Sequence, residues 1–272
     1  MIKINVTNAK QLITKSKLPD ADYVCNPYTG CIHKCIYCYA EFMKRFTNHT
    51  EDWGNFLDIK YSPDMRLPKF KPDDTILISS VTDAYNPLER KYEATKKVLL
   101  QLMDVDVKVE ILTKSSLVLR DIELLKKFKK IKIGISLNTL DDAMRKKTEP
   151  FASDINKRLE ALQILHKENI QNYAFISPIF PGLSDVPTII EKMKSYVDCF
   201  CFENLNLRAG YKKRVFDFII YTRPDLLPLY EKIYNQKDMS YWENLKNTII
   251  EICRSQNIEY KIYFYHEKIK KQ

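Results

Sequence analysis

Long apolar runs are missing from this sequence of 272 residues, and their absence limits where the protein acts. No uncharged apolar stretch approaches the roughly 18 residues that a membrane span requires. The opening segment, MIKINVTN, lacks the long apolar core of a signal peptide. We therefore expect a soluble, cytoplasmic protein with no membrane partner.

The distribution of the cysteines argues against disulfide bonds. The chain has seven cysteines, an odd number, and three of them fall within the segment CIHKCIYC. Such clustering favours thiolates that are kept reduced to bind a metal. A second CxxC motif is absent from the sequence, whereas structural zinc usually takes four ligands in paired spacings. Zinc is therefore the weaker alternative for this cluster.

The spacing of Cys31, Cys35 and Cys38 is the most informative pattern in the chain. Three residues separate the first pair and two separate the second. A loop with thiolates at this CxxxCxxC spacing can hold three corners of a four-iron, four-sulfur cluster and leave the fourth iron without a protein ligand. His33 lies inside the loop, but three thiolates already complete the motif, so we expect it to support the loop rather than bind metal.

The net charge of +9 carries less information than the cysteines. A basic chain is compatible with an anionic partner such as nucleic acid. Lysines far outnumber arginines, however, and are scattered through predicted helices, as at Lys126, Lys127, Lys129 and Lys130. This distribution is more typical of solvated helix faces, so nucleic acid is one of several candidate partners.

From residue 75 the sequence alternates short β-branched runs with longer segments of helical period, which predicts repeated βα units and a parallel sheet. The predicted strands span 22–25, 75–80, 107–113, 131–138, 173–178 and 200–207. The predicted helices span 117–129, 153–169 and 186–197, with another that begins at Asn86 as N-cap. Residues 47–74 contain several prolines and predict a loop, hairpin or lid. Six βα units indicate an α/β fold, a partial (βα)6 barrel of the TIM type.

The end of the chain predicts an extension of this barrel. We place the core domain and its N-terminal segment at residues 1–222 and the extension at 223–272. The extension contains two predicted helices, the second opening with Ser240 and Glu243 in capping-box register, and an alternating strand at 260–265. We expect this C-terminal α/β extension to cover one end or edge of the barrel.

Polar residues follow successive predicted strands, at the end where barrels of this type place their active sites. These segments are, in chain order, the cysteine loop, Val81-Thr82-Asp83, Lys114-Ser115, Asn138-Thr139 and residues 178–182. Such repeated placement is harder to explain by packing than any one residue is. The pattern therefore predicts a binding site at the carboxyl ends of the strands.

At this point the chain resembles the radical SAM superfamily, and most closely its branch related to spore photoproduct lyase. The resemblance begins with the CxxxCxxC motif and Tyr37 just before its last cysteine, and it covers roughly residues 22–210. The matching segments are 26–40, VTDAYNPLE at 81–89, LTKS at 112–115, RD at 120–121, SLNTL at 136–140, EP at 149–150 and PIFPGLSD at 178–185. The resemblance implies an enzyme, with the lyase and transferase classes both open.

The resemblance implies a 4Fe-4S cluster bound by Cys31, Cys35 and Cys38, with S-adenosyl-L-methionine (SAM) on the open iron. An external one-electron reductant, such as flavodoxin or ferredoxin, would supply the electron. Reductive cleavage of SAM would yield a 5'-deoxyadenosyl radical that abstracts hydrogen from a substrate, while the protein orients the reactants. DNA, RNA, a peptide and a small molecule all remain candidate substrates.

The resemblance also assigns SAM contacts by position along the chain. The matching residues are Tyr37 at the adenine, Ser80, Thr82 and Asp83 at the amino group, Lys114 at the carboxylate, and Ser136, Asn138 and Arg145 at the ribose or carboxylate. A zwitterionic amino acid needs an acceptor for its ammonium and a cation for its carboxylate, which Asp83 and Lys114 offer. Structural alternatives stay open: Lys114 as a surface lysine, Asp83 as a helix cap, and Arg145 in an ion pair with Glu149.

The sequence does not identify a hydrogen donor. Spore photoproduct lyase is expected to carry a cysteine near the second strand, and the segment 77–81 here has none. Cys199 and Cys201 share one face of a predicted strand, and they are candidates together with Tyr85. Packing as small buried residues is the simpler interpretation for these two cysteines and for the others outside the loop.

Two functional hypotheses follow from these patterns. The first is a radical SAM enzyme that cleaves SAM and abstracts hydrogen from a substrate. The second is a non-catalytic iron-sulfur or zinc protein that binds nucleic acid or a protein partner. Metal content distinguishes them, because the first predicts about four irons with matching sulfide and the second about one zinc.

Overall fold

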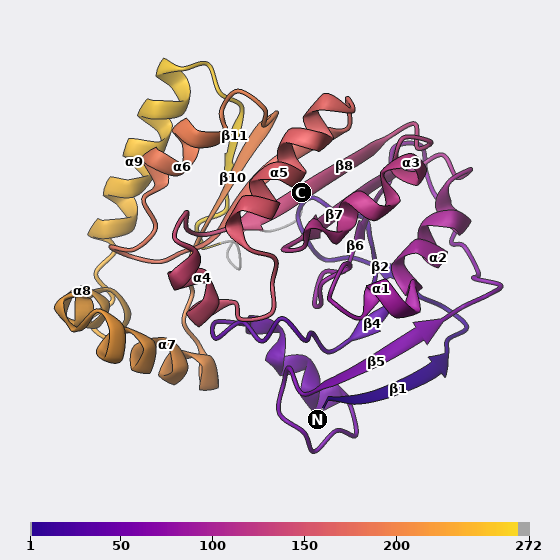
Figure 1. The fold of residues 1–272 in the computed structure, drawn as a ribbon, viewed down its shortest axis with the longest axis horizontal. Coiled ribbons are helices and arrows are strands. Elements are labelled where there is room, and N and C mark those ends of the chain that lie inside the picture. The colour runs from indigo at the N-terminus through magenta and orange to yellow at the C-terminus, as the bar shows by residue number, and fades with distance from the viewer. Residues whose placement is uncertain (1, 266–272) are drawn as a thin grey trace.

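An eight-stranded sheet organises the protein, and the computed structural model describes residues 2–265. The strand order is β11-β10-β9-β8-β7-β6-β3-β2, in which β2 and β3 are antiparallel and the other neighbours are parallel. The strands are β2 (Ile13–Lys15), β3 (Tyr23–Cys25), β6 (Thr75–Ile78), β7 (Lys108–Thr113), β8 (Ile131–Leu137), β9 (Gln171–Ile179), β10 (Cys199–Asn204) and β11 (Tyr260–Ile262). Because β3 and β6 to β10 lie side by side in chain order, the predicted α/β fold of the partial TIM-barrel type is confirmed (Figure 1).

Helices follow the strands mostly where the hydrophobic periodicity predicts them. They are α1 (Glu89–Tyr92), α2 (Ala94–Leu102), α3 (Ile122–Leu125), α4 (Asp142–Thr148), α5 (Ile155–Lys167), α6 (Val186–Met193), α7 (Ala209–Thr222), α8 (Leu227–Tyr234) and α9 (Ser240–Ser255), with 3-10 helices η1 (Tyr39–Phe46), η2 (Ser116–Asp121) and η3 (Pro224–Leu226). The prediction at 117–129 is wrong in form, because a 3-10 helix occupies its first part and α3 ends at Leu125. Helices α4 and α7 are additions to the prediction.

The helix predicted to begin at Asn86 is split in two. It begins at Glu89, and Glu93 between α1 and α2 has a φ of +52°. The buried carboxylate of Glu89 accepts hydrogen bonds from the backbone N–H groups of Thr95 and Lys96, at 3.0 and 3.2 Å. A side chain of α1 therefore satisfies donors at the start of α2 that a continuous helix would have bonded internally.

The capping box predicted at Ser240 and Glu243 is also wrong. Ser240 is the first residue of α9, and Asp238 accepts a hydrogen bond from its backbone N–H at 2.7 Å. The following strand, β11, ends at Ile262 and pairs in parallel with β10, so the C-terminal segment lengthens the barrel sheet. The domain division after residue 222 stays a prediction.

The two faces of the barrel sheet have different surroundings. Successive strand residues point to opposite faces, and one face presents apolar side chains such as Ile111, Ile135 and Phe202. Leu162 of α5 and Ile190 of α6 belong to the same buried cluster, so the helices cover this face. The opposite face of the sheet lines the inside of the open barrel, and Tyr173, Cys199 and Cys201 lie on it.

Residues 56–61, inside the segment predicted as a loop, form a strand instead. This strand, β5 (Phe56–Tyr61), lies between β1 (Lys3–Asn8), in parallel, and β4 (Tyr28–Thr29), antiparallel. Leu57 and Ile59 are fully buried, which explains why an apolar stretch here forms a strand. The small sheet lies at the edge of the molecule near the N-terminus (Figure 1), and β4 leads directly into the cysteine loop.

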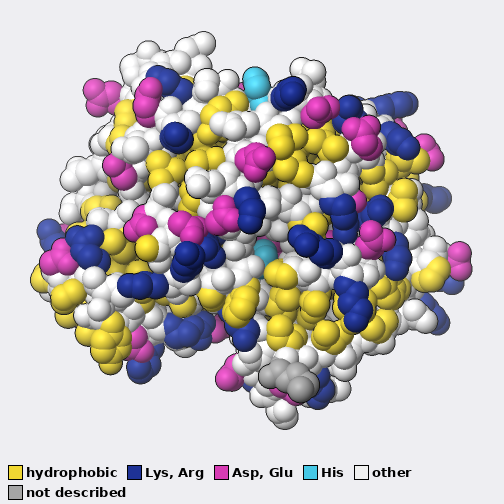
Figure 2. Space-filling model, in the orientation of Figure 1, with side chains coloured by type: hydrophobic (Ala, Val, Ile, Leu, Met, Phe, Trp, Pro, Cys, Tyr) yellow, Lys and Arg dark blue, Asp and Glu magenta, His cyan; other side chains and the backbone are white. Residues whose placement is uncertain are grey.

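The surface carries charges of both signs. Figure 2 shows lysine and arginine side chains interspersed with aspartate and glutamate over the visible face. Several lysines pair with carboxylates, as Lys126 does with Glu168 at 2.8 Å and Lys130 with Asp73 at 3.1 Å. None of the helices in the described part of the chain is both long and apolar enough to span a bilayer.

Candidate functional site

The cysteine loop connects β4 to η1 and is fixed at its start by a glycine. Gly30 has a φ of +92°, and a Cβ atom there would lie 2.5 Å from the carbonyl oxygen of Phe56, so only glycine fits. Thr82, in the loop after β6, donates its hydroxyl to the Gly30 carbonyl. This predicted site residue therefore anchors the chain directly before Cys31.

The three thiols of the loop lie close enough to influence one another. Cys31, Cys35 and Cys38 form no disulfide. Burial raises the pKa of each thiol, and neighbouring thiols raise the pKa values of Cys31 and Cys35 further. Three adjacent thiols of this kind become thiolates only beside positive charge, which bound iron would provide. The donor set therefore fits an iron-sulfur cluster.

The spread of these thiols differs from that of a single-metal site. Within residues 2–265, no three cysteine, histidine, aspartate or glutamate side chains converge closely enough to hold one metal ion. In a four-iron cluster the thiolates bind different irons, so the ligands lie farther apart than those of one tetrahedral zinc. The spacing of the three loop thiols therefore fits the ligands of a four-iron cluster better than those of a single zinc ion.

Asp83 joins the cysteine loop to the carboxyl end of β7. Its carboxylate accepts hydrogen bonds from the Thr113 hydroxyl at 2.5 Å and from the backbone N–H groups of Tyr85 and Lys114, each at 2.9 Å. His33 Nδ1 lies 3.4 Å from the same carboxylate. Burial would raise the pKa of Asp83, but His33 and these donors hold it below its usual range. Asp83 is thus a filled structural acceptor, and its contact with the SAM amino group stays a prediction.

Lys114 presents a free cation beside the cysteine loop. Its ammonium lies 5.8 Å from the centroid of the Tyr37 ring, and it has no carboxylate within 4.0 Å in the described part of the chain. Burial lowers the pKa of Lys114, whereas Glu149 and Cys35 raise it and produce a net increase. The side chain is therefore protonated and available to an anionic ligand, as its predicted role requires.

A fully buried ion pair between Glu149 and Arg158 holds the cysteine loop through Tyr37. Glu149 accepts hydrogen bonds from the hydroxyl of Tyr37 and from the guanidinium of Arg158 on α5. Arg158 also donates to the carbonyl of Ser136 on β8 at 2.9 Å. Arg158 is not among the residues predicted from the sequence, although a charged residue on the apolar face of α5, next to Leu159, is a signal that could have identified it.

Arg145 is occupied by local contacts. Its guanidinium pairs with Asp142 at 2.9 Å and donates to the carbonyl oxygens of Glu149 and Ala152 at 3.4 and 3.3 Å. The alternative ion pair between Arg145 and Glu149 is wrong, because the Glu149 carboxylate pairs with Arg158. The predicted contact of Arg145 with SAM stays a prediction.

Asn138 is a predicted site residue whose polar atoms remain free. It follows β8, is fully buried, and neither its Oδ1 nor its Nδ2 atom has a hydrogen-bond partner among the described residues. A buried polar group left unpaired costs roughly 1–3 kcal/mol, so this position suits a polar ligand. Ser136 instead donates to the Ser177 carbonyl at 3.2 Å, and Ser80 accepts from Asn26 at 3.4 Å.

Cys199 and Cys201 lie on one face of β10, as predicted, and both are buried. They pack with Tyr173, whose ring crosses Gly134 so closely that a Cβ atom on this glycine would overlap it. At the usual rise of a strand, Cys199 lies roughly 16 Å and Cys201 roughly 10 Å before the end of β10 at Asn204. Packing accounts for both thiols, and their role as hydrogen donors stays a prediction.

Tyr85, the third candidate hydrogen donor, lies in the loop after β6. Its side chain is fully buried, with the guanidinium of Arg120 at 6.0 Å from the ring centroid. Burial raises the pKa of the Tyr85 hydroxyl, and the negative charge of the nearby Asp121 raises it further. A neutral phenol is therefore present, and its part in hydrogen transfer stays a prediction.

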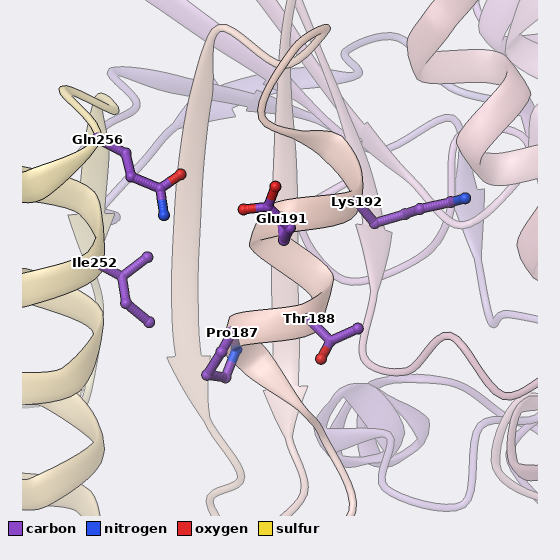
Figure 3. A pocket seen from close by; sticks show the side chains of 6 residues that line it. All are labelled: Pro187, Thr188, Glu191, Lys192, Ile252 and Gln256. Atoms are coloured by element: carbon purple, nitrogen blue, oxygen red, sulfur yellow. The ribbon is translucent and has the colours of Figure 1, made fainter.

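A groove of about 570 Å³ between α6 and α9 contains none of the predicted site residues (Figure 3). Its lining consists of Pro187, Thr188, Glu191, Lys192, Ile252 and Gln256. A second cavity, of about 620 Å³, lies at the amino ends of the strands and is rich in lysines. Thiols line neither cavity, so the cysteine loop remains the candidate centre.

The fold and the site together define an α/β-barrel enzyme whose thiols, lysine and free amide gather at the carboxyl ends of the strands. A sequence model of the radical SAM superfamily matches residues 25–192, more than half of the chain. The chain therefore belongs to the radical SAM superfamily, as its motifs predict.

Comparisons with known proteins agree with this assignment. An uncharacterized protein of Methanocaldococcus jannaschii is 39% identical over 250 residues, which cover 91% of this chain and 93% of the relative. The structure of spore photoproduct lyase complexed with dinucleoside spore photoproduct is similar at a TM-score of 0.59 and 17% identity, over 81% of this chain and 67% of that chain. SuiB of Streptococcus suis bound to S-adenosylmethionine has a TM-score of 0.55 and 14% identity, over 90% and 51% of the two chains. At these identities the two structures establish the shared fold.

Proposed function

We propose that this protein binds a 4Fe-4S cluster through Cys31, Cys35 and Cys38 and cleaves SAM reductively. The observation that carries the proposal is the Lys114 cation beside the loop thiols. Asn138, at the carboxyl end of the neighbouring strand β8, adds a buried amide with no hydrogen-bond partner among residues 2–265. When bound, the cluster and SAM would together supply a 5'-deoxyadenosyl radical for hydrogen abstraction from the substrate, with one electron from an external reductant of the flavodoxin or ferredoxin type.

The residues of the chain bind and orient the cofactors. Lys114 binds the SAM carboxylate through its protonated ammonium, and Asn138 offers a donor and an acceptor to the ribose, or a donor to the carboxylate. The backbone at Tyr37 meets the adenine, while its hydroxyl holds the loop through Glu149. Thr82 contributes by fixing the start of the loop.

Anaerobic reconstitution tests the proposal. Protein loaded with iron and sulfide and reduced with dithionite should contain about four irons per chain and release 5'-deoxyadenosine from SAM. A Cys253→Ala variant, altered at a buried cysteine of α9, should behave like the wild type. A loaded sample that leaves SAM intact contradicts the proposal, and about one bound zinc without sulfide supports the non-catalytic alternative.

A nucleic acid is the substrate class that the surface beside the loop favours. Tyr39, Phe42 and Phe46 on η1, directly after Cys38, are 56%, 41% and 66% exposed. The guanidinium of Arg45 lies 5.5 Å from the Phe42 ring centroid and 4.7 Å from that of Phe46. Exposed aromatic rings with a neighbouring cation suit base stacking and phosphate contact. The spore photoproduct lyase complex with a dinucleoside lends support from the fold family.

Binding measurements with single-stranded and duplex oligonucleotides test this substrate class. Affinity should fall steeply as salt rises, because phosphate contacts release counterions. A Phe46→Ala variant should weaken binding by about 1–3 kcal/mol if the ring stacks on a base. Leu100→Ala, another exposed apolar side chain but on α2, serves as the control. Absent or salt-independent binding points to a peptide or small-molecule substrate.

A further inference from the structure

Trp53 donates a hydrogen bond to one of the three loop thiols. Its indole Nε1 lies 3.2 Å from the Sγ atom of Cys38, although the two residues belong to different segments, before and after η1. The chain has two tryptophans, and the other, Trp242, is buried beside Tyr241 and Phe264 near the C-terminus. One tryptophan therefore contacts the site while the second packs elsewhere.

Close packing fixes the direction of this indole. The ring of Trp53 meets Phe56 edge to face at 5.7 Å, and Phe56 stacks on His49 at 3.9 Å. Gly54 has a φ of +93°, and a Cβ atom there would lie 2.7 Å from Cγ of Lys34, a residue of the cysteine loop. The segment around Trp53 therefore interlocks with the loop, so the N–H group points at the sulfur in a constrained geometry.

The loop side of this contact is held as well. Lys34 donates from its ammonium to the Asn55 side chain at 2.6 Å, two residues after Trp53. At the other end of the segment, the carbonyl of Phe56 lies against Gly30, the residue before Cys31. Gly30 and Gly54 thus allow the two segments to approach, and the hydrogen bond from Lys34 to Asn55 holds them together.

We propose that Trp53 sets the reduction potential of the cluster held by Cys31, Cys35 and Cys38, an inference that rests on the proposed function. Reduction adds one electron from the external reductant, and part of the added negative charge resides on the cysteine sulfurs. Hydrogen bonds to these sulfurs are among the factors that set cluster potentials. An N–H donor stabilises the more negative, reduced form, so Trp53 raises the potential and eases electron entry. Trp53 is a positioning residue that acts through Cys38.

A Trp53→Phe variant removes the donor and keeps an aromatic ring against Phe56. We expect reconstituted Trp53→Phe protein to have the same iron and sulfide content as the wild type and a more negative midpoint potential in a dithionite titration followed by electron paramagnetic resonance. Trp242→Phe makes the same change away from the loop and should retain the wild-type potential. An unchanged potential in a fully loaded Trp53→Phe protein overturns the inference.

A second measurement tests the inference if the Trp53→Phe variant fails to bind the cluster. In the Trp242→Phe background Trp53 is the remaining tryptophan, so indole labelled with ¹⁵N reports on it alone. The reduced cluster should show a magnetic coupling to this nitrogen, and its absence overturns the inference. Failure of the wild type to bind iron and sulfide overturns the proposed function itself, whereas an intact, SAM-cleaving cluster that is indifferent to Trp53 overturns the inference alone.

Discussion

Two groups of neighbouring thiols lie on the same barrel, one within the loop before η1 and one along β10, and their surroundings differ. The loop thiols have the Lys114 cation and the Trp53 indole as neighbours. Cys199 and Cys201 pack instead with Tyr173 and other aromatic rings on the inner face of the sheet. Cys199 and Cys201 are buried and the loop thiols are partly exposed, yet each group has a lysine nearby, Lys132 for Cys199 and Lys114 for Cys35. The Trp53 donor and the CxxxCxxC spacing are the features on which we predict that the loop thiols bind metal and the β10 thiols pack.

The largest expected effect separates the two groups directly. Cys35→Ala removes one cluster ligand, and we expect bound iron and 5'-deoxyadenosine release to fall to background levels. Cys199→Ala, on β10, should retain about four irons per chain and SAM cleavage. Iron, sulfide and product analysis after anaerobic reconstitution checks both variants. Loss of iron from the β10 variant, with a native fold by circular dichroism, would break the comparison.

The next effect concerns the buried pair that supports the loop. Arg158→Met leaves the Glu149 carboxylate buried without its partner, which should lower the free energy of unfolding by about 3–5 kcal/mol. Combining it with Glu149→Leu removes the stranded charge and should recover part of this loss. Denaturant unfolding of the apoprotein measures both variants. A double variant no more stable than Arg158→Met would show that the pair does not act electrostatically.

A smaller effect is expected at the cation beside the loop. Lys114→Gln removes the charge that binds the SAM carboxylate, and a hydrogen bond to a charged group contributes about 1.5–3 kcal/mol. SAM affinity should therefore fall by about 10- to 100-fold, while iron content stays at the wild-type level. Lys129→Gln, at an exposed lysine that lines the cavity at the amino ends of the strands, is the matched control. Equal SAM affinity in the two variants would remove Lys114 from the site.

The smallest effect is a dependence on pH at α4, which leads to Glu149. A hydrogen bond from Arg145 holds the pKa of Asp142 down to about 2, from 3.8. Because the folded pKa is the lower one, this carboxylate stabilises the protein above pH 3.8 and loses that contribution as the pH falls towards 2. Asp142→Asn should flatten the stability profile in this window. Denaturant unfolding of both proteins between pH 2 and 4 measures the difference, and equal slopes would contradict the role of Asp142.

Much of the fold could be predicted because its strands and helices have local signatures. Short apolar runs predict the six barrel strands, which are β3 and β6 to β10. Helical periodicity over a few turns predicts α5 and α6. β5 was missed because the prolines that follow it suggested a loop, and its stability comes from pairing with β1 and β4. The break between α1 and α2 at Glu93 was missed because it depends on the Glu89 carboxylate of α1, which accepts hydrogen bonds from the first N–H groups of α2.

The sequence by itself determined the spacing of Cys31, Cys35 and Cys38 and the order of the βα units that places their loop at the carboxyl ends of the strands. Both depend on neighbours along the chain. Only the tertiary structure decided which partners surround the thiols: within residues 2–265 it left Lys114 without a carboxylate partner, paired Glu149 with Arg158 rather than with Arg145, and placed the Trp53 indole against Cys38. These choices depend on strand register and on burial, which bring distant residues together and make each unsatisfied charge or donor costly.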